Sequence, residues 1–432
     1  MIWNESKECM SRDEMNHLQS TRLVKQVKNI YHSVESYRKK MQAIGLEPGD
    51  IRGIEDLEKL PFTTKDDLRD NYPCGLFAVP RSEIVRIHAS SGTTGKATVV
   101  GYTRRDIENW EECVARILTM ANIGSSDTVQ VSYGYGLFTG GLGAHYGAEF
   151  LGATVVPLST GNTKKQLTMM RDLGVTAICC TPSYLMYLAE AIEEQGILND
   201  LVLKSAICGA EPWTENMRRE IERRLHIEAH DIYGLSEVMG PGVAGDCQYH
   251  TGLHINEDHF LAEIVSAETL KPIPDGETGE LVFTTLTKEA LPLIRYRTKD
   301  LTSITHEKCE CGRTTARLSR FKGRSDDMLI IRGVNVFPSQ VEAALLDISE
   351  VSPNYLMIVD RVDNLDTLEV QVEVDERFFS DEIKELENLT KKITHVLQQA
   401  LLIVPKVKLV EPRTLQRSEG KAVRVIDKRK LI

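Results

Sequence analysis

The sequence predicts an α/β protein with a large N-terminal domain, in which helices flank mostly parallel sheets, and a small C-terminal α+β domain. Two observations carry this prediction. Between residues 103 and 225, helix-like and strand-like segments alternate, which is typical of βαβ units. After residue 337 the sequence shows a helix, two strands, a second helix and a last strand, with the spacing of a ferredoxin-like unit.

Composition and charge narrow the class of protein. The 432 residues suffice for a core in both domains, and 41% hydrophobic and 27% charged residues are ordinary for a globular protein. A net charge of −11 argues against a general nucleic-acid binder. Residues 1–16 lack the features of a signal peptide, the most apolar long stretch is interrupted by polar residues, and nine cysteines form no regular framework. We therefore expect a cytoplasmic protein without a membrane segment.

The first elements are predicted to be scaffold. Thr64 precedes Asp66 and Asp67, an arrangement that favours the start of a short helix. Before it, apolar side chains recur at alternating steps of four and three, which predicts one long amphipathic helix that Gly45 ends. These apolar residues are Leu23, Val27, Ile30, Val34, Tyr37 and Met41.

The alternating segments that follow are expected in a regular order. The predicted strands cover residues 128–132, 153–157, 176–181 and 205–208, and the predicted helices cover residues 105–121, 138–151 and 214–225, with two more starting after 164 and at 183. In such folds ligands gather at the carboxyl ends of the strands. The C-terminal domain is expected to contain helices at 339–346 and 381–401 and strands near 355–359, 368–374 and 406–410.

A loop rich in glycine and hydroxyl residues is predicted between two short strands at residues 84–87 and 99–102. Its glycines let backbone N–H groups turn toward an anion, and its hydroxyls and lysine add donors and charge for a polyphosphate. It is not the P-loop of NTPases, because Ser90 and Ala97 stand where that motif needs glycine and Ser or Thr. A flexible polar hairpin is the alternative. The candidate phosphate-binding residues are Ser90, Ser91, Gly92, Thr93, Thr94, Gly95 and Lys96.

Other candidate site residues follow predicted strands. Tyr233 offers a ring for stacking on a base, Ser236 a hydroxyl and Glu237 a carboxylate for Mg²⁺. Asp300 could hold a ribose diol or cap a helix. After the strand at 128–132, aromatic residues alternate with glycines, which fits a flat apolar pocket or a glycine-packed core helix. The pocket candidates are Tyr133, Tyr135, Phe138 and Ala144.

Taken in order, the motifs resemble those of the adenylate-forming acyl-CoA synthetases, and among them the phenylacetate-CoA ligase family. The resemblance spans the chain from about residue 20 to its C-terminal end. The motifs that carry it are Leu60-Pro-Phe-Thr-Thr-Lys65, Ser90-Ser-Gly-Thr-Thr-Gly-Lys96, Phe138-Thr-Gly-Gly-Leu-Gly143, Gly209-Ala-Glu-Pro212, Tyr233-Gly-Leu-Ser-Glu237, Glu257-Asp-His-Phe260, Tyr296-Arg-Thr-Lys-Asp300, Gly323-Arg-Ser-Asp-Asp327, Gly333-Val-Asn-Val-Phe-Pro338 and Arg417-Ser-Glu-Gly-Lys421.

The resemblance implies a ligase with two half-reactions. An aromatic carboxylate and ATP, with Mg²⁺, give an acyl adenylate and pyrophosphate, and the thiol of coenzyme A then displaces AMP. The site must offset negative charge with N–H donors, metal and lysine. Beside the glycine loop, the residues implied in nucleotide and Mg²⁺ binding are Gly209, Ala210, Glu211, Pro212, Asp231, Ile232, Tyr233, Gly234, Ser236, Glu237, Asp300 and Arg324.

The resemblance also implies that the C-terminal domain is a mobile lid. Lys421 is the expected catalytic residue, since its ammonium would bridge the carboxylate and the α-phosphate as charge develops. Asp326 matches the hinge, which places the domains at residues 1–325 and 326–432, and the face around Arg332 and Gly333 would meet coenzyme A. Asn335 stands where many relatives have arginine, so no phosphate contact is assigned to it.

Cysteine and histidine spacing predicts a structural zinc site. Cys309 and Cys311 are separated by one residue and followed by a glycine, and thiolates with an imidazole suit Zn²⁺. Together with Cys247 they need a fourth ligand, for which His250 and His259 compete with His254. The resemblance favours the set Cys247, His254, Cys309 and Cys311. Metal-free reduced thiols are the alternative.

Two other functions compete with a ligase that uses free coenzyme A. An adenylating enzyme could pass the acyl group to a carrier-protein thiol or an amine, although the chain shows no carrier domain. A nucleotide-binding regulator would not need Lys421. Homodimers are common in the resembled family, so we expect one here. The sequence does not identify the acid, because one methylene changes discrimination by only ~1–3 kcal/mol.

Overall fold

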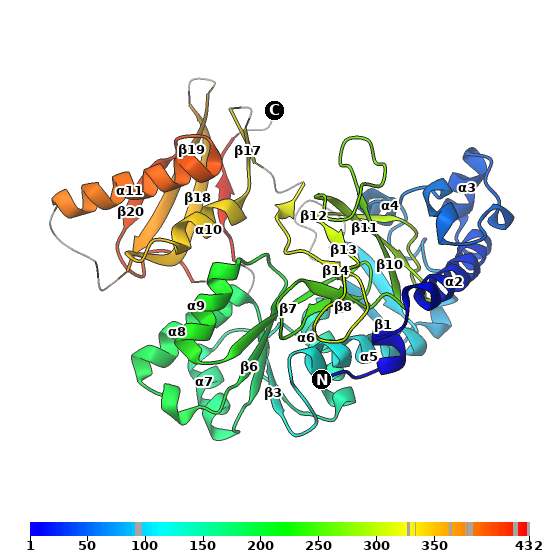
Figure 1. Cartoon of the computed structure of the whole chain (residues 1–432), viewed down its shortest axis with the longest axis horizontal. Coiled ribbons are helices and arrows are strands. Elements are labelled where there is room, and N and C mark those ends of the chain that lie inside the picture. The colour runs from blue at the N-terminus through cyan, green and yellow to red at the C-terminus, as the bar shows by residue number, and fades with distance from the viewer. Residues whose placement is uncertain are drawn as a thin grey trace. The chain divides into compact units, whose positions relative to one another are not determined.

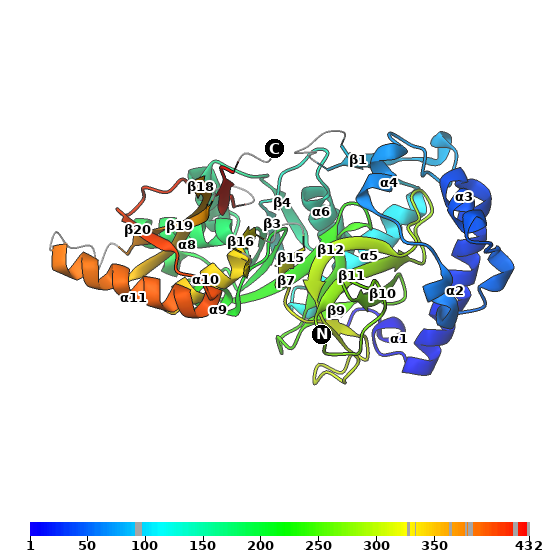
Figure 2. The ribbon, with the colours of Figure 1, turned by 90° about the horizontal axis from the view of Figure 1, so that it is seen from above.

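A computed structural model of the chain describes residues 1–90, 97–325, 329–332, 334–362, 365–375, 378, 383–417 and 422–429 (Figures 1 and 2). Contacts within the chain define two compact units. The first comprises Met1–Cys180, Ile197–Ala210 and Ile227–Arg320, and the second comprises Thr181–Gly196, Glu211–His226 and Phe321–Ile432. Two segments from the middle of the chain thus group with the C-terminal residues, whereas the boundary at residues 325 and 326 stays a prediction.

The main sheet of the first unit has the strand order β13-β14-β9-β8-β7-β6-β5-β3-β4. Neighbouring strands are parallel from β4 to β7 and antiparallel from β7 to β13. The βαβ pattern predicted the parallel half. The strands are β3 (Thr128–Val131), β4 (Thr154–Pro157), β5 (Ala177–Cys180), β6 (Ser205–Gly209), β7 (Glu228–Leu235), β8 (Gly240–Asp246), β9 (Leu253–Ile255), β13 (Ile304–Thr305) and β14 (Arg317–Leu318).

Two antiparallel groups of strands complete the first unit. β1 (Arg86–Ala89) pairs with β2 (Val99–Tyr102), as the pattern around the glycine loop predicts. β10 (Phe260–Val265), β11 (Gly279–Thr285) and β12 (Tyr296–Thr302) form a second antiparallel sheet. The turn before β11 has the sequence Pro274-Asp-Gly276 and is closed by a hydrogen bond of 3.2 Å from Glu277 N–H to Pro274 O.

Seven α-helices and four 3-10 helices lie in the described part of the first unit. The predicted long N-terminal helix is two helices, because Val34 adopts an extended conformation between them and buries its side chain completely. The helices are α1 (Glu5–Glu8), α2 (Arg12–Ser33), α3 (Glu35–Ala43), η1 (Pro48–Asp50), η2 (Ile54–Lys59), α4 (Lys65–Asp70), η3 (Arg81–Glu83), α5 (Arg104–Met120), α6 (Thr139–Leu151), α7 (Thr163–Asp172) and η4 (Leu198–Asp200).

Glycines allow α6 to pack tightly against α5. A Cβ atom added to Gly143 would lie 2.6 Å from the Trp110 ring, and one added to Gly147 would lie 2.3 Å from Val114. Real Cβ atoms do not approach neighbours so closely, so these positions require glycine. The glycine-rich segment therefore forms a packed core helix, which is one of the two alternatives that the sequence left open.

The described residues of the second unit form four α-helices and a four-stranded sheet of order β20-β19-β18-β21. Figure 1 shows α10 and α11 on one face of this sheet, where Val341 and Leu397 join its buried core. The elements are α8 (Pro182–Gln195), α9 (Glu215–Leu225), β15 (Gly323–Arg324), β16 (Leu329–Ile331), β17 (Val334–Val336), α10 (Pro338–Leu346), β18 (Val351–Val362), β19 (Leu365–Val374), α11 (Ile383–Leu401), β20 (Lys406–Val410) and β21 (Val425–Asp427).

The predicted ferredoxin-like topology is wrong. In that fold the parallel strands of a βαβ unit are split by another strand. Here β20 follows α11 and pairs directly and in parallel with β19, so the unit is not split. Within the described part of the chain, no helix has both the length and the apolar character that crossing a membrane requires.

Candidate functional site

The stem of the glycine loop is a short, well-paired hairpin. Ser90 N–H donates to Thr98 O at 3.0 Å, and Thr98 N–H donates to the Ser90 hydroxyl at 3.3 Å. On β1, the buried His88 places its Nδ1 3.0 Å from Leu137 O, which joins the stem to the segment between β3 and α6. Ser90 thus lies at the mouth of the loop, whereas Ser91, Gly92, Thr93, Thr94, Gly95 and Lys96 lie outside the described residues.

The carboxyl ends of β6 and β7 bring several nucleotide-binding candidates together. Gly209 pairs with Ile232 in the parallel register of these strands. A Cβ atom on Gly209 would lie 2.3 Å from Ile232 O, and one on Gly234 would lie even closer to Gly240 O, so both positions exclude a side chain. Ala210 adopts φ = +71°, a conformation that L-residues rarely adopt and that often marks functional loops.

Tyr233 and Asp300 come from different sheets and are hydrogen-bonded. The Tyr233 hydroxyl donates to Asp300 Oδ2 at 2.6 Å, and the Tyr233 ring stacks on Phe283 with centroids 6.3 Å apart. Asp231, two residues before Tyr233 on β7, is 9% exposed. The bond couples the candidate for base stacking to the candidate for ribose binding.

The turn of the β7–β8 hairpin carries the metal candidate. Glu237 is 7% exposed, and Lys65 Nζ lies 3.8 Å from its Oε1. The Ser236 hydroxyl is 3.0 Å from that of Thr139 at the start of α6. A nearly buried carboxylate beside hydroxyls suits a hard cation such as Mg²⁺. Lys65 and Thr139 were part of quoted motifs, but sequence reasoning assigned neither a role.

The buried Lys288 supports the β7–β8 turn indirectly, through Tyr102. Lys288 Nζ lies 3.4 Å from the centroid of the Tyr102 ring, and the Tyr102 hydroxyl donates to Met239 O at 2.7 Å. Tyr102 also stacks on Trp110, with centroids 5.0 Å apart. Burial lowers the pKa of Lys288 to about 8, although Asp106 opposes the shift. No periodicity marks this lysine in the sequence.

The four pocket candidates lie in different environments. Tyr133 is buried and donates its hydroxyl to Cys180 O at 2.7 Å, and Ala144 is buried on α6. Tyr135 is half-buried, with its hydroxyl 3.1 Å from His145 Nδ1, while Phe138 is 45% exposed at the start of α6. Two of the four are thus core residues, and two remain accessible to a ligand.

The second unit holds the remaining nucleotide and lid candidates. Glu211 accepts Ser183 N–H at 2.8 Å and Ala422 N–H at 2.7 Å, and Pro212 follows it. Arg332 has φ = +51° and donates to Asp366 O at 2.8 Å. Arg324 lies half-buried on β15. The candidates outside the described residues are Asp326, Gly333 and Lys421.

The structure brings the four predicted zinc ligands together. Ligand atoms of Cys247, His254, Cys309 and Cys311 all lie within 4.8 Å of one another. Cys247 Sγ is 3.7 Å from Cys309 Sγ, and Cys311 Sγ is 3.4 Å from His254 Nε2. Of the two competing histidines, His250 contacts Asp246 and His259 contacts Thr287, so neither belongs to this cluster.

The chemistry of this cluster, which we call the Cys3His cluster, fits a zinc ion. Hydrogen bonds from Cys247 and His254 lower the pKa of the Cys311 thiol, while the hydrogen bond to Cys311 and burial raise the pKa of Cys247; three sulfurs with one imidazole nitrogen are a ligand set of structural zinc sites. His254 Nδ1 lies 3.0 Å from the Thr315 hydroxyl, which fixes the ring so that Nε2 faces the sulfurs. All nine cysteines are free thiols.

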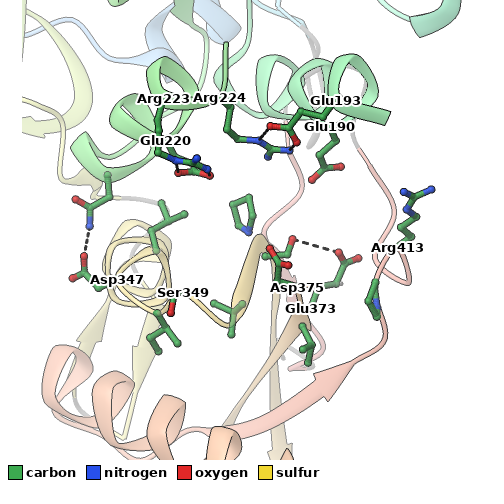
Figure 3. A pocket seen from close by; sticks show the side chains of 18 of the residues that line it. Glu190, Glu193, Glu220, Arg223, Arg224, Asp347, Ser349, Glu373, Asp375 and Arg413 are labelled. Carbon is green, nitrogen blue, oxygen red and sulfur yellow. Dashed lines mark hydrogen bonds and ion pairs between the residues drawn. The ribbon is translucent and has the colours of Figure 1, made fainter. Parts of the chain in front are cut away.

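A cavity of about 910 Å³ in the second unit does not resemble an aromatic-acid site. Acidic and arginine side chains line it, and many of them are paired with each other (Figure 3). Arg223 pairs with Glu220 at 2.7 Å, and Arg224 pairs with Glu193. Sites for flat organic ligands are mostly apolar, so we assign no substrate to this cavity.

Comparisons with known families agree with the fold. The AMP-binding enzyme family matches residues 15–286, and the AMP-binding enzyme C-terminal domain matches residues 333–429. The fold therefore defines an AMP-binding enzyme, in which an α/β region is followed by a small α+β region. The structure also superimposes on 2-hydroxyisobutyryl-CoA ligase in the postadenylation state with 2-HIB-AMP, with a TM-score of 0.92 and 29% identity, covering 98% of this chain and 91% of that one.

Curated relatives narrow the class. The phenylacetate-coenzyme A ligase of Escherichia coli is 52% identical over 98% of this chain and 97% of its own length. That of Thermus thermophilus is 48% identical over the full length of both chains. The chain therefore belongs to the AMP-binding, adenylate-forming enzymes and, among them, to the phenylacetate-CoA ligase family, which confirms the resemblance seen in its motifs.

Proposed function

We propose that this protein activates phenylacetate, or a closely related arylacetate, as its acyl adenylate and transfers the acyl group to coenzyme A. The products are the acyl-CoA thioester, AMP and pyrophosphate. The observation that carries the proposal is 48% and 52% identity, over nearly the whole chain, to two curated phenylacetate-coenzyme A ligases. The relatives reported are all CoA ligases, so nothing favours transfer to a carrier protein.

The first unit would hold the nucleotide at the strand ends. Tyr233 stacks on adenine, and Asp300 accepts hydrogen bonds from the ribose, with Tyr233 Oη already 2.6 Å from its carboxylate. Gly209 lets the ends of β6 and β7 lie close together, because a side chain there would collide with Ile232 O. The nucleotide would therefore lie at the carboxyl ends of β6 and β7, where Asp231, Ile232 and Gly234 belong to the β7 backbone beside it.

Charge near the reacting phosphate would be offset by groups around the hairpin turn. Glu237 is the proposed carboxylate ligand of Mg²⁺, and Ser236 the nearby hydroxyl; the ion, when bound, neutralises phosphate oxygens. Lys65, whose Nζ lies 3.8 Å from Glu237 Oε1, adds a positive charge near the proposed position of the phosphates. The glycine loop beyond Ser90 is proposed to hold the pyrophosphate leaving group.

Residues of the second unit would complete the two half-reactions. Lys421 would stabilise the charge that develops between carboxylate and α-phosphate, and Arg324 would reach the nucleotide. Between the half-reactions the C-terminal residues would turn about Asp326, and the face around Arg332 and Gly333 would then meet coenzyme A. Glu211, one of the nucleotide candidates, accepts the N–H of Ala422, which follows Lys421 in the sequence, and this contact supports the role proposed for Lys421.

The proposed acid pocket lies around the accessible aromatic residues. Tyr135 and Phe138 would contact the ring of the substrate, while Tyr133 and Ala144 support them from the core. We also propose a structural zinc in the Cys3His cluster, on the basis of its ligand geometry. A homodimer and a cytoplasmic location, both expected from the sequence, belong to the same proposal.

A substrate panel tests the proposed function. The enzyme, Mg-ATP and coenzyme A are incubated with phenylacetate, ring-substituted arylacetates, benzoate, indole-3-acetate and medium-chain fatty acids, and AMP and thioester are measured together. We expect equal amounts of AMP and thioester with phenylacetate. A preference for a fatty acid would overturn the substrate class, and AMP without thioester would overturn coenzyme A as the acceptor.

A further inference from the structure

A second cluster of metal-ligand side chains lies beside the Cys3His cluster but shares no residue with it. His230 comes from β7, Asp246 ends β8, and His250 follows in the next turn. Their ligand atoms all lie within 4.8 Å of one another, as do those of the Cys3His cluster. We call these three residues the His2Asp cluster.

The backbone holds the three side chains in place. His230 is in the centre of the pairing between β6 and β7, opposite Ile207, and is completely buried. His250 has φ = +52° and donates its N–H to Cys247 O at 3.0 Å, which closes a tight turn. This turn brings the His250 ring over the His230 ring, with centroids 5.1 Å apart and planes inclined by 31°.

The carboxylate of Asp246 is only half used by the protein. Its Oδ2 lies 2.6 Å from His250 Nδ1. Its Oδ1 is buried and has no hydrogen-bond partner among the described residues, and the whole side chain is almost inaccessible to water. A buried carboxylate oxygen without a donor is unfavourable, so it needs either a donor or a cation. The Asp246 carboxylate thus keeps one oxygen, Oδ1, that the contact with His250 does not use.

A second His–Asp pair in the same unit shows what an ordinary pair looks like. His306 Nδ1 lies 2.6 Å from Asp275 Oδ2, the same distance as in the His2Asp cluster. Both side chains of this pair are about half exposed, so water completes their hydrogen bonding, and no third ligand group joins them among the described clusters. Burial and the second imidazole distinguish the His2Asp cluster from this pair.

We propose that His230, Asp246 and His250 bind a divalent transition-metal ion of the zinc class. Two imidazoles and a carboxylate are a ligand set for Zn²⁺ and its neighbours, and the fourth position would be filled by water or by Glu228, whose Oε2 is 3.6 Å from His230 Nε2. In tetrahedral zinc sites ligand atoms lie about 3.3 Å apart, as follows from metal–nitrogen distances of ~2.0–2.1 Å. Metal binding would require the side chains to rotate until the cluster reaches that size.

The metal would clamp the open end of the β7–β8 hairpin. Ser236 and Glu237 lie in the turn of the same hairpin, at its other end, so the ion would not touch the reacting groups. Its role is structural: it would join the start of β7 to the turn that leads into the Cys3His cluster. The inference is independent of the proposed ligase activity.

Zinc stoichiometry tests the inference. The full-length protein is stripped with a chelator and dialysed against Zn²⁺, and bound metal is counted by mass spectrometry. If both clusters bind, wild type holds two equivalents. His250→Ala should hold one fewer equivalent than wild type, and so should Asp246→Asn, which keeps the side-chain shape. His306→Ala is the matched control, and its stoichiometry should equal that of wild type.

Cobalt(II) identifies which equivalent is lost. Thiolate ligands give Co²⁺ strong charge-transfer absorption, whereas imidazole and carboxylate ligands do not. His250→Ala should keep the thiolate band and lose the equivalent that lacks it, which also shows that the variant is folded. An unchanged zinc count in His250→Ala, or an equal loss in His306→Ala, would overturn the proposal.

Discussion

The two ends of the β7–β8 hairpin present opposite kinds of chemistry. Its turn carries Ser236 and Glu237, whose oxygen atoms suit Mg²⁺ and phosphate. Its open end carries His230, Asp246 and Cys247, and nitrogen and sulfur dominate there. One hairpin would therefore carry the proposed Mg²⁺ site at its turn and the proposed structural sites for transition-metal ions at its open end.

The two ends are also supported differently. The turn rests on single side chains from other elements, since Tyr102 holds Met239 O and Lys65 lies beside Glu237. At the open end the ligand groups contact one another directly, as Cys247 and Cys309 do at 3.7 Å. Changes at the turn should thus alter the rates of reaction, and changes at the open end should alter metal content and stability.

The largest expected effect concerns adenylation. Lys421→Ala removes the charge that would stabilise the transition state, so we expect acyl-adenylate formation to fall by about 10²–10³-fold or more. Thioester formation from supplied adenylate, ATP binding and metal content should change little. Pyrophosphate release and single-turnover thioester assays measure the two steps, with the exposed Lys428→Ala as control. Equal loss of both half-reactions would refute this division.

The next effect is on stability at the open end. Cys309→Ser combined with Cys311→Ser removes two of the four proposed zinc ligands, so one metal equivalent should be lost and the melting temperature should fall. Because the cluster is remote from the hairpin turn, the kcat of the surviving folded enzyme should be close to that of wild type. Cys74→Ser, outside the cluster, is the control. Full stability of the double variant in chelator would contradict a structural metal.

Lys288 should give the turn a pH-dependent stability. The pKa of Lys288 in the folded protein is about 8, below the ordinary value of 10.5, because burial disfavours the ammonium. Between these two values only the unfolded chain keeps the proton, so the free energy of unfolding should rise with pH from about 8 to 10.5. One pKa unit is about 1.4 kcal/mol, and the rise approaches about 3 kcal/mol.

Urea unfolding at pH 7 to 10 measures this contribution. The difference between wild type and Lys288→Met cancels the other groups that titrate in the same range. Lys164→Met, at an exposed position, serves as the control and should leave the pH profile unchanged. A constant difference between wild type and Lys288→Met across this range would show that Lys288 keeps an ordinary pKa.

The smallest effect concerns the ribose. Asp300→Ala should raise the KM for ATP by about 10–100-fold, because hydrogen bonds to charged groups contribute ~1.5–3 kcal/mol. The variant should also lose most of the preference for ATP over 2′,3′-dideoxy-ATP. Tyr233→Phe keeps the ring and removes only the donor to Asp300, so its effect should be smaller. An intact preference in Asp300→Ala would exclude the ribose role.

Local sequence patterns predicted much of the fold. Sequence patterns located the alternating helices and strands from α5 to α9 within one or two residues, because each helix must bury one face and the central parallel strands are mostly apolar. They missed the break at Val34, whose apolar side chain fits the helical pattern although its backbone is extended. They also missed the direct pairing of β19 with β20, since strand order depends on contacts that spacing does not encode.

Site residues could be predicted only where they belong to short sequence motifs. Cys309 and Cys311 stand close together in the chain, which is why the Cys3His cluster could be anticipated. His230 and Asp246 are distant in sequence, and only the pairing of β7 with β8 brings them together. Lys288 resembles any other lysine in the sequence, and its contact with Tyr102 depends on tertiary packing.

The contact between Glu8 and Arg313 has a consequence for synthesis of the chain. Arg313 Nε donates to Glu8 Oε2 at 2.5 Å, and Thr314 N–H donates to Glu8 O, across a sequence separation of 305 residues. At translation rates of ~5–20 residues per second, Glu8 leaves the ribosome roughly 15 to 60 s before Arg313 does. During that interval Glu8 lacks its charged partner and can accept only nearby N–H groups such as those of Trp3 and Asn4, so this corner of the first unit becomes native only after Arg313 has been synthesised.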